Sequence, residues 1–338
     1  MHHAQVPDYR YASDVRPQCR HVDHPLGDYQ RQGSAFDHAA YRAAGVEQTQ
    51  FPESVILRTV LPASYGYDPQ GVPPFEDVKT DNMTALYNDI IFGPIRSRRL
   101  GLSLGVNLLP VESKLCSFDC IYCECGWNDE HPGRRRFNSR EDVRNMLREV
   151  LGRMVGEGTP PDVITFAGNG EPTMHPDFEG VIDDTIALRD ELCPAARVSV
   201  LSNATQIHRE DVRRALQRVD NNILKLDSAF DSTVQLVNKP QGAYTVERTV
   251  ELLKLFEGRL ILQTMFLRGE YEGQRVDNTR EEEVAAWLRL VEEIAPRQVM
   301  VYSLDRDTPC KTLEKVSRED LLAIAARVEA LGIPCSVA

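Results

Sequence analysis

The sequence lacks several features that mark other classes of protein. The 338-residue chain has no run of 18 or more apolar residues, and its N-terminus lacks the basic start and apolar centre of a secretory signal. These absences predict a cytoplasmic protein without a membrane partner. Basic residues are in deficit, and the net charge of -12 argues against broad electrostatic capture of nucleic acid, although a local basic patch can still overcome it.

The cysteines do not form the regular pattern of a disulfide framework. Eight cysteines are present, and three of them, Cys116, Cys120 and Cys123, are spaced Cys-x3-Cys-x2-Cys behind an apolar, strand-like run. This arrangement suits a reducing compartment, and three thiolates so close together predict a metal site. Sulfur ligands suit zinc and iron-sulfur clusters about equally well.

A second close pair of cysteines is missing, and this absence separates the two metals. A structural zinc site closes its tetrahedron with four protein ligands, usually as two close pairs. Three thiolates can instead hold three irons of a [4Fe-4S] cube and leave the fourth iron open to a non-protein ligand. A non-catalytic zinc- or cluster-binding interaction protein is the alternative. Cys19, His21 and His24 form a weaker candidate for a second metal site.

The cysteine motif, with Tyr122 directly before its last member, resembles the signature of the radical S-adenosylmethionine (SAM) superfamily. Joined to the upstream stretch Gly93-Pro-Ile-Arg-Ser-Arg-Arg-Leu-Gly-Leu-Ser-Leu-Gly105, it resembles the wyosine-synthase-like Fe-S oxidoreductases of that superfamily. The resemblance implies a [4Fe-4S] cluster on Cys116, Cys120 and Cys123 whose open iron binds SAM. It implies reductive cleavage of SAM to a 5′-deoxyadenosyl radical, and an electron donor of the flavodoxin or ferredoxin type.

Strand-like and helical segments alternate after the cysteine motif. Counting the run that delivers the cysteines, six β/α units are predicted, with later strands at 163–167, 197–201, 222–226, 260–266 and 298–302. Such alternation predicts a parallel sheet with helices outside. Six units cannot close an eight-stranded barrel. The fold class is therefore α/β, a partial (βα)6 TIM-like barrel of the radical SAM type, to which 333–337 adds a short last strand.

Three helix starts carry a capping signal. A Ser or Thr is followed three residues later by an acidic residue, which is typical of a helix N-terminus. The pairs are Ser139 with Asp142, Thr279 with Glu282 and Ser317 with Asp320.

The first 82 residues differ in kind from the rest. They hold five of the eight histidines and show little sustained periodicity, apart from a weak strand-like run at 55–60. We expect residues 1–82 to be a poorly ordered extension or a mis-called translation start, because Met83 opens a segment that reads like the start of a compact enzyme. Residues 83–338 are expected to form the radical SAM core domain.

A glycine-rich loop follows the second predicted strand. The stretch Gly168-Asn169-Gly170-Glu171-Pro172 resembles the family's Gly-Gly-Glu-Pro motif, with Asn169 and Gly170 displaced by one position. Glycines allow close approach to a ligand. The resemblance implies that Glu171 accepts hydrogen bonds from the SAM ammonium group, that Ser202 and Asn203 contact the SAM ribose or carboxylate, and that Tyr122 lies near the adenine.

Charged residues on a later strand are the candidates for catalysis. Lys225 and Asp227 are unexpected in a buried strand unless they are paired or functional, and alternation places both on one face. Cys310 follows the sixth strand and could be a hydrogen-atom donor, a ligand or an inert thiol. Gln263 and Met265 are weaker candidates, for which a role in the core is equally consistent.

Two basic groups flank the cysteines. Arg96, Arg98 and Arg99 precede the motif, and residues 134–136 are all arginine. They could hold the phosphates of a nucleotide, a tRNA or a phosphorylated metabolite, or they could be solvated turns. A nucleoside or tRNA substrate and a peptide substrate therefore both stay open. Cys125 could exchange with a ligand but is left out of the metal set.

Overall fold

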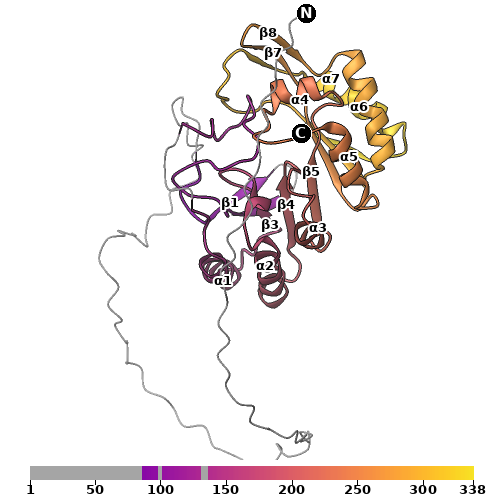
Figure 1. Ribbon diagram of the computed structural model, residues 1–338. Coiled ribbons are helices and arrows are strands. Elements are labelled where there is room, and N and C mark those ends of the chain that lie inside the picture. Colours follow the sequence, from indigo (N-terminus) through magenta and orange to yellow (C-terminus); the bar gives the residue numbers. More distant parts are fainter. Residues whose placement is uncertain (1–85, 98–100, 131–135) are drawn as a thin grey trace, which may run out of the picture. The chain divides into compact units, whose positions relative to one another are not determined.

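Eight strands form one sheet in the computed structural model, which describes residues 86–97, 101–130 and 136–338 (Figure 1). The strands lie in the spatial order β1-β2-β3-β4-β5-β6-β9-β11. Their bounds are β1 (Ile91–Ser97), β2 (Gly101–Val106), β3 (Val163–Phe166), β4 (Arg197–Ser202), β5 (Asn221–Lys225), β6 (Ile261–Met265), β9 (Gln298–Tyr302) and β11 (Cys335–Val337). In this sheet, β2, β3, β4, β5, β6, β9 and β11 pair in parallel with their neighbours. Strand β1 pairs with β2 in the antiparallel sense.

The predicted fold class is confirmed. The six predicted parallel strands are β2, β3, β4, β5, β6 and β9, and the predicted short last strand is β11. No pairing in the described ranges joins β1 to β11, so the sheet remains open, as expected of a barrel with fewer than eight β/α units.

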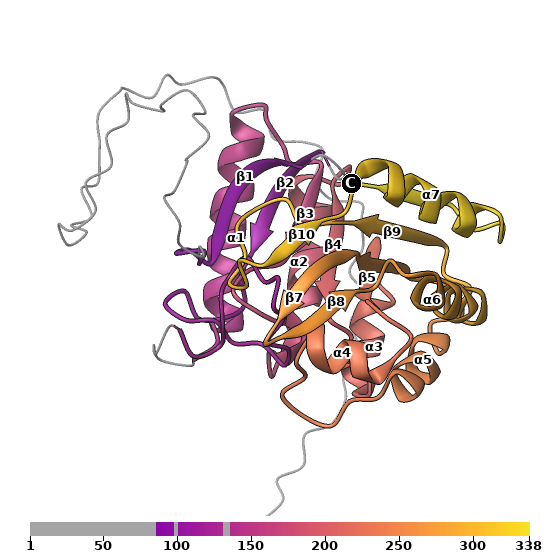
Figure 2. The same ribbon diagram turned by 90° about the horizontal axis from the view of Figure 1, so that it is seen from above.

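The helices lie outside the curved sheet (Figure 2). They are α1 (Arg140–Gly156), α2 (Phe178–Leu192), α3 (Glu210–Leu216), α4 (Asp231–Val237), α5 (Val246–Lys254), α6 (Glu281–Ile294) and α7 (Arg318–Glu329), with a short 3-10 helix at Pro172–Met174. The main core lies between these helices and the sheet. All four residues of β3 are buried, because interior side chains cover one face of this strand and helices cover the other.

Two of the three predicted helix caps are confirmed. The side chains of Ser139 and Ser317 accept hydrogen bonds from the backbone N–H groups of Asp142 and Asp320. The prediction for Thr279 is wrong, because Arg280 occupies the cap position of α6 without a side-chain cap bond. The Thr279 hydroxyl instead donates to the side chain of Asp277, over 2.6 Å.

A second, three-stranded sheet was not predicted. Strands β7 (Leu267–Tyr271), β8 (Gln274–Asp277) and β10 (Leu313–Lys315) pair in the order β10-β7-β8. These strands are short and half-exposed, so they lack the apolar runs that mark the strands of the main sheet. The backbone N–H of Cys310 donates to the carbonyl of Ile121, and the loop before β10 thereby contacts the cysteine segment.

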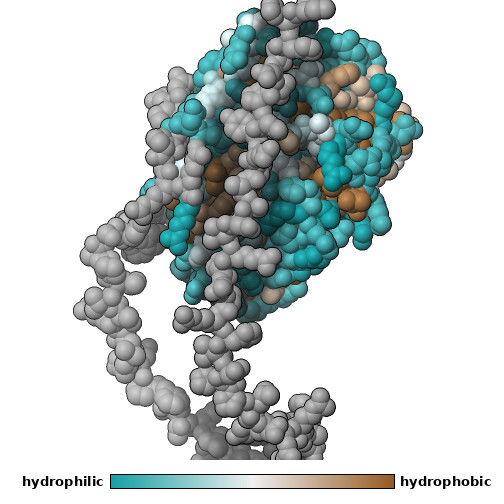
Figure 3. All heavy atoms as spheres, in the orientation of Figure 1, coloured by the Kyte–Doolittle hydropathy of each residue, from teal (hydrophilic) through white to brown (hydrophobic). Residues whose placement is uncertain are grey.

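The surface and the helices carry few apolar stretches. The face in Figure 3 is mostly hydrophilic, with hydrophobic residues gathered on the side of α5, α6 and α7, where Leu255 and Leu322 are about half exposed.

No helix within the described ranges is both long and apolar enough to cross a membrane. Residues 1–82 and Met83, with the predicted site at Cys19, His21 and His24, lie outside the described residues.

Candidate active site

The three clustered cysteines lie on the segment between β2 and α1. Cys116, Cys120 and Cys123 are each half-buried, and all three are free thiols. The segment is anchored by the chain after α4, because the backbone N–H groups of Asp119 and Ile121 donate to the carbonyls of Asn238 and Val237 over 2.9 and 3.0 Å. Residues distant in sequence therefore set the position of this loop.

A buried lysine accompanies the cysteines and was missed by the sequence analysis. The side chain of Lys114 is 1% exposed, and its Nζ donates to the Gly126 carbonyl over 2.6 Å and to Asp119 over 3.1 Å. Burial acts to lower the pKa of Lys114, but the charges of the three cysteines and of Asp119 raise it. The signal in the sequence was a lysine two residues before the first cysteine.

Two amides point at cysteine sulfurs. Asn203 Nδ2 lies 3.6 Å from Cys116 Sγ, and Asn238 Nδ2 lies 3.5 Å from Cys120 Sγ. Burial raises the pKa of Cys120 to about 11, whereas a hydrogen bond with Cys125 lowers the pKa of Cys123 to about 6. Asn238, which directly follows α4, was not predicted, and only its place in the turn Asn-Lys-Pro distinguished it in the sequence.

The ligand geometry bears on the choice of metal. Among the residues that the structure describes, no three His, Cys, Asp or Glu side chains converge as ligands of one metal ion. A structural zinc site needs such convergence on a single ion. In a [4Fe-4S] cube each thiolate binds a different iron, so three separated sulfurs are compatible with a cluster.

The glycine-rich loop after β3 packs directly against the cysteine segment. Gly170 has φ +138°, and a Cβ there would lie 1.9 Å from the carbonyl oxygen of Leu115, so only glycine fits. The Asn169 side chain is fully buried and donates to the carbonyls of Tyr87 and Pro110, over 2.9 Å each. Asn169 thus holds the loop in place. Gly168 has φ +136° and approaches the Asn107 side chain.

Glu171 joins the ends of β3 and β4. Its carboxylate is 2% exposed and accepts hydrogen bonds from Ser202 Oγ over 2.8 Å and from the backbone N–H of Asn203 over 2.6 Å. It also accepts from the Thr173 hydroxyl and backbone N–H. Burial raises the pKa of Glu171, and these hydrogen bonds oppose that effect. Pro172 opens the short 3-10 helix that follows.

Lys225 and Asp227 pair inside the barrel. Their Nζ and Oδ1 atoms are 3.5 Å apart, with side-chain exposures of 14% and 1%. Asp227 also accepts hydrogen bonds from the Tyr122 hydroxyl, from Asn238 Nδ2 and from the backbone N–H of Met265. Lys225 donates to the Tyr302 hydroxyl over 2.8 Å, so this network extends to the wall of a cavity.

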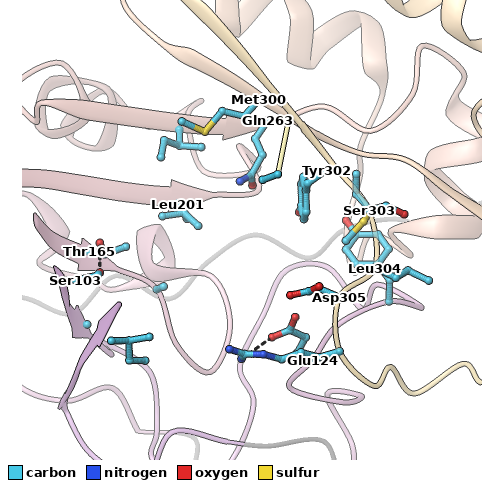
Figure 4. Close-up of a pocket in the computed structure, with 18 of the residues that line it drawn as sticks. Ser103, Glu124, Thr165, Leu201, Gln263, Met300, Tyr302, Ser303, Leu304 and Asp305 are labelled. Atoms are coloured by element: carbon cyan, nitrogen blue, oxygen red, sulfur yellow. Dashed lines mark hydrogen bonds and ion pairs between the residues drawn. The ribbon is translucent and has the colours of Figure 1, made fainter. Parts of the chain in front are cut away.

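A cavity of about 350 Å³ lies inside the partial barrel (Figure 4). The strands contribute Ser103, Thr165, Leu201, Gln263, Met300 and Tyr302 to its wall. Of the residues predicted to bind SAM, Tyr122 lines this cavity, and the glycine-rich loop with Ser202 and Asn203 does not. The cavity therefore adjoins the predicted SAM site and is separate from most of it.

Cys310 and the two arginine groups are the remaining predicted site residues. Cys310 is buried, and its Sγ lies 3.2 Å from Thr312 Oγ1 and 3.5 Å from the Glu270 carbonyl, so its thiol is held by β7 and the segment before β10. Arg96 lines the cavity, whereas residues 98, 99, 134 and 135 lie outside the described ranges. The catalytic role of Cys310 stays a prediction, as do the roles of the SAM-binding residues.

The comparison with known families agrees with the cysteine motif. The family model described as "Radical SAM superfamily" matches residues 113–281. A UPF0026 protein of Synechocystis is 30% identical over 230 residues, covering 67% of this chain and 78% of that protein. A UPF0026 protein of Methanocaldococcus jannaschii is 34% identical over 183 residues and 53% of this chain. The chain spans 54% of the length of that archaeal protein and 32% of a similar Brachyspira hyodysenteriae protein named GTPase Obg.

Solved structures show the same fold at low sequence identity. A radical SAM methyltransferase from Sphaerobacter thermophilus has a TM-score of 0.53 and 16% identity, covering 70% of this chain and 65% of the other. SuiB of Streptococcus suis, bound to S-adenosylmethionine, has a TM-score of 0.50 and 15% identity, covering 67% of this chain and 49% of the other.

Proposed function

Because the chain belongs to the radical SAM superfamily, we propose that it is a radical SAM enzyme with a [4Fe-4S] cluster on Cys116, Cys120 and Cys123. The donor set fits such a cluster, since three free thiols lie on one loop and two amides point at their sulfurs. The buried Lys114 would offset part of the negative charge of three thiolates. This combination of thiols, amide donors and a buried cation is the observation that carries the proposal.

A [4Fe-4S] cluster held by the three cysteines would supply one electron for the cleavage of SAM to methionine and a 5′-deoxyadenosyl radical, and that radical would take a hydrogen atom from the substrate to give 5′-deoxyadenosine. The role of the chain is to hold these partners and to keep water from the radical. Gly168 and Gly170 would hold the loop against Asn107 and Leu115, beside the cysteine segment where SAM would bind, and Tyr122 would lie against the SAM adenine. Glu171 would act chiefly by fixing Ser202 and Asn203.

We propose that Lys225, Asp227 and Cys310 act on the substrate. Tyr302 lines the cavity and accepts a hydrogen bond from Lys225 behind it, which suits orientation of a polar substrate by the phenol. Two substrate classes are consistent with this site: a nucleoside or tRNA, and a peptide. An electron donor of the flavodoxin or ferredoxin type would supply the electron.

The compartment and the extent of the enzyme are part of the same proposal. All seven cysteines in the described ranges are free, and a cluster-binding enzyme of this kind suits the reducing cytoplasm. We assign catalysis to residues 83–338 and expect residues 1–82 to contribute no site residue. Mass spectrometry of the native protein tests the mis-called start, because any peptide from upstream of Met83 would contradict it.

Anaerobic reconstitution with iron and sulfide, followed by dithionite and SAM, tests the activity. We expect wild-type protein to form 5′-deoxyadenosine, measured by chromatography, and Cys120→Ala to form none. Cys335→Ser is the matched control, because Cys335 lies on β11 away from the cysteine segment and should leave the yield unchanged. Tightly bound zinc in wild-type protein, without any 5′-deoxyadenosine, would favour the non-catalytic zinc-binding alternative.

A further inference from the structure

The Gln263 side chain enters the cavity from β6 without a hydrogen-bond partner in the described part of the chain. The residue is only 6% exposed, and Figure 4 shows its amide pointing into the open space of the cavity. An amide that faces open space loses its hydrogen bonds to water when a ligand enters, so a ligand there must match its donor and its acceptor. Its retention inside a cavity points to a ligand that completes its hydrogen bonds.

Most neighbours of Gln263 on the cavity wall are apolar, and on β5 Lys225 lies in register with it. Met265 and Met300 flank it on β6 and β9, and Leu201 and Ile223 form the adjoining wall. The Tyr302 ring faces the same space (Figure 4). Thioethers and aromatic rings make favourable contacts with planar rings. The inner cavity therefore suits a planar group that carries a hydrogen-bonding edge.

The opposite wall carries a pair of hydroxyl groups. Ser103 Oγ and Thr165 Oγ1 are 2.9 Å apart, and each residue is at least nine-tenths buried. One hydroxyl donates to the other, so one proton of the pair is left for a ligand. These hydroxyls lie on β2 and β3, and Gln263 lies on β6 (Figure 4). A ligand between them could form hydrogen bonds with both walls of the cavity.

The rim of the cavity has one cation without an ion pair among the described residues. Arg306 pairs with Glu124 over 3.1 Å, and Lys315 pairs with Asp305 over 3.2 Å. Arg96 lines the same cavity from β1, is exposed, and has no ion-pair partner in the described ranges. An unpaired guanidinium at the mouth suits a phosphate, which it can bind in bidentate fashion.

We propose that the cavity binds a nucleotide unit of the substrate, with the base edge on Gln263 and the phosphate on Arg96. This inference rests on the proposed function. A glutamine amide matches a base edge that offers one donor and one acceptor side by side. The thioethers, the Tyr302 ring and the exposed Arg96 fit the ring and the phosphate of the same unit. Of the predicted SAM residues only Tyr122 lines the cavity, so we assign the base to the substrate, and the titration below keeps SAM saturating to separate the two.

Isothermal titration calorimetry with reconstituted full-length enzyme tests this assignment. SAM is kept at saturation and no reductant is added, so that the SAM site is filled and no turnover occurs. The probes are AMP, GMP, CMP and UMP with the four corresponding nucleosides. We expect at least one monophosphate to bind, and its nucleoside to bind more weakly.

Two variants separate the two contacts. Gln263→Met keeps the volume of the side chain and should weaken nucleoside and monophosphate alike, by about tenfold for two lost hydrogen bonds. Arg96→Gln, at an exposed position, should weaken the monophosphate by about tenfold and leave the nucleoside unchanged. Arg197→Gln, at an exposed position on β4 outside the cavity lining, is the control and should change neither affinity.

Several results would overturn the assignment. It fails if no probe binds wild-type enzyme, or if Gln263→Met and Arg96→Gln bind the probes as wild type does. It also fails if Gln263→Met lowers the affinity for SAM itself, because Gln263 would then belong to the SAM site. Failure of the proposed function is measured in a separate assay, in which the wild-type enzyme would form no 5′-deoxyadenosine. A short oligoribonucleotide that binds more tightly than the monophosphate identifies RNA as the source, and weaker binding identifies the free nucleotide.

Discussion

The amide nitrogen of Asn238 lies 3.5 Å from Cys120 Sγ, although 118 residues separate the two in the chain. The same nitrogen lies 2.7 Å from Asp227 Oδ2 and 2.9 Å from the Tyr122 hydroxyl. The carboxylate of Asp227 therefore holds the amide in the orientation that brings it to the sulfur. A strand-end acid inside the barrel is in this way connected to the environment of the proposed cluster.

Asn238→Ala should lower the reduction potential of the reconstituted cluster. A hydrogen bond to a cysteine sulfur stabilises the reduced cluster, which carries one more negative charge, and its loss makes reduction less favourable. The measurement is a redox titration followed by electron paramagnetic resonance. Gln217→Ala, an exposed amide at the end of α3, is the control and should leave the potential unchanged. An unchanged potential in Asn238→Ala would assign this amide a purely structural role.

Lys114→Met should also lower the potential, because it removes a buried positive charge beside three thiolates. Lys114→Arg keeps the charge and should retain a potential close to that of wild type. If neither variant retains iron after desalting, the lysine is needed to close the loop between Asp119 and Gly126. Iron retention with an unchanged potential in Lys114→Met would contradict the electrostatic role.

Asp227→Asn should destabilise the fold by about 3 kcal/mol, because it leaves the buried ammonium of Lys225 without its ion partner. The free energy of unfolding is measured by urea denaturation of the apoprotein. Lys225→Met combined with Asp227→Asn removes both charges and should lose less than the sum of the two single variants. Additive losses would show that the two side chains do not interact.

Gly170→Ala should destabilise the protein by more than about 2 kcal/mol and reduce iron binding. The added Cβ would clash with the Leu115 carbonyl, and the φ of +138° at this position is unfavourable for alanine. Gly152→Ala is the matched control, because this glycine lies in α1 with open space around it and should gain about 0.5–1 kcal/mol. Thermal unfolding and iron analysis measure both. Equal stability of Gly170→Ala and wild type would contradict the close approach of the two loops.

Local patterns predicted the parts of the site that lie close together in sequence. The spacing of Cys116, Cys120 and Cys123 is contained in eight residues, and the glycine-rich loop follows its strand directly. Alternation along β5 placed Lys225 and Asp227 on one face, and the structure pairs them there. The three-stranded sheet escaped prediction because its strands are too short and too exposed to show a period.

The sequence by itself determined the parallel order of the six β/α units and the chemistry of the cysteine segment, because hydrophobic periodicity and ligand spacing act within one stretch of chain. Only the tertiary structure decided that Lys114 is buried, that Asn238 faces Cys120 and that the Gln263 side chain has no hydrogen-bond partner among the described residues. These relationships depend on which distant strands and loops meet, and on how much water their packing leaves between them. A residue's charge or amide group is visible in the sequence, whereas its partners and its solvation arise only when the barrel assembles.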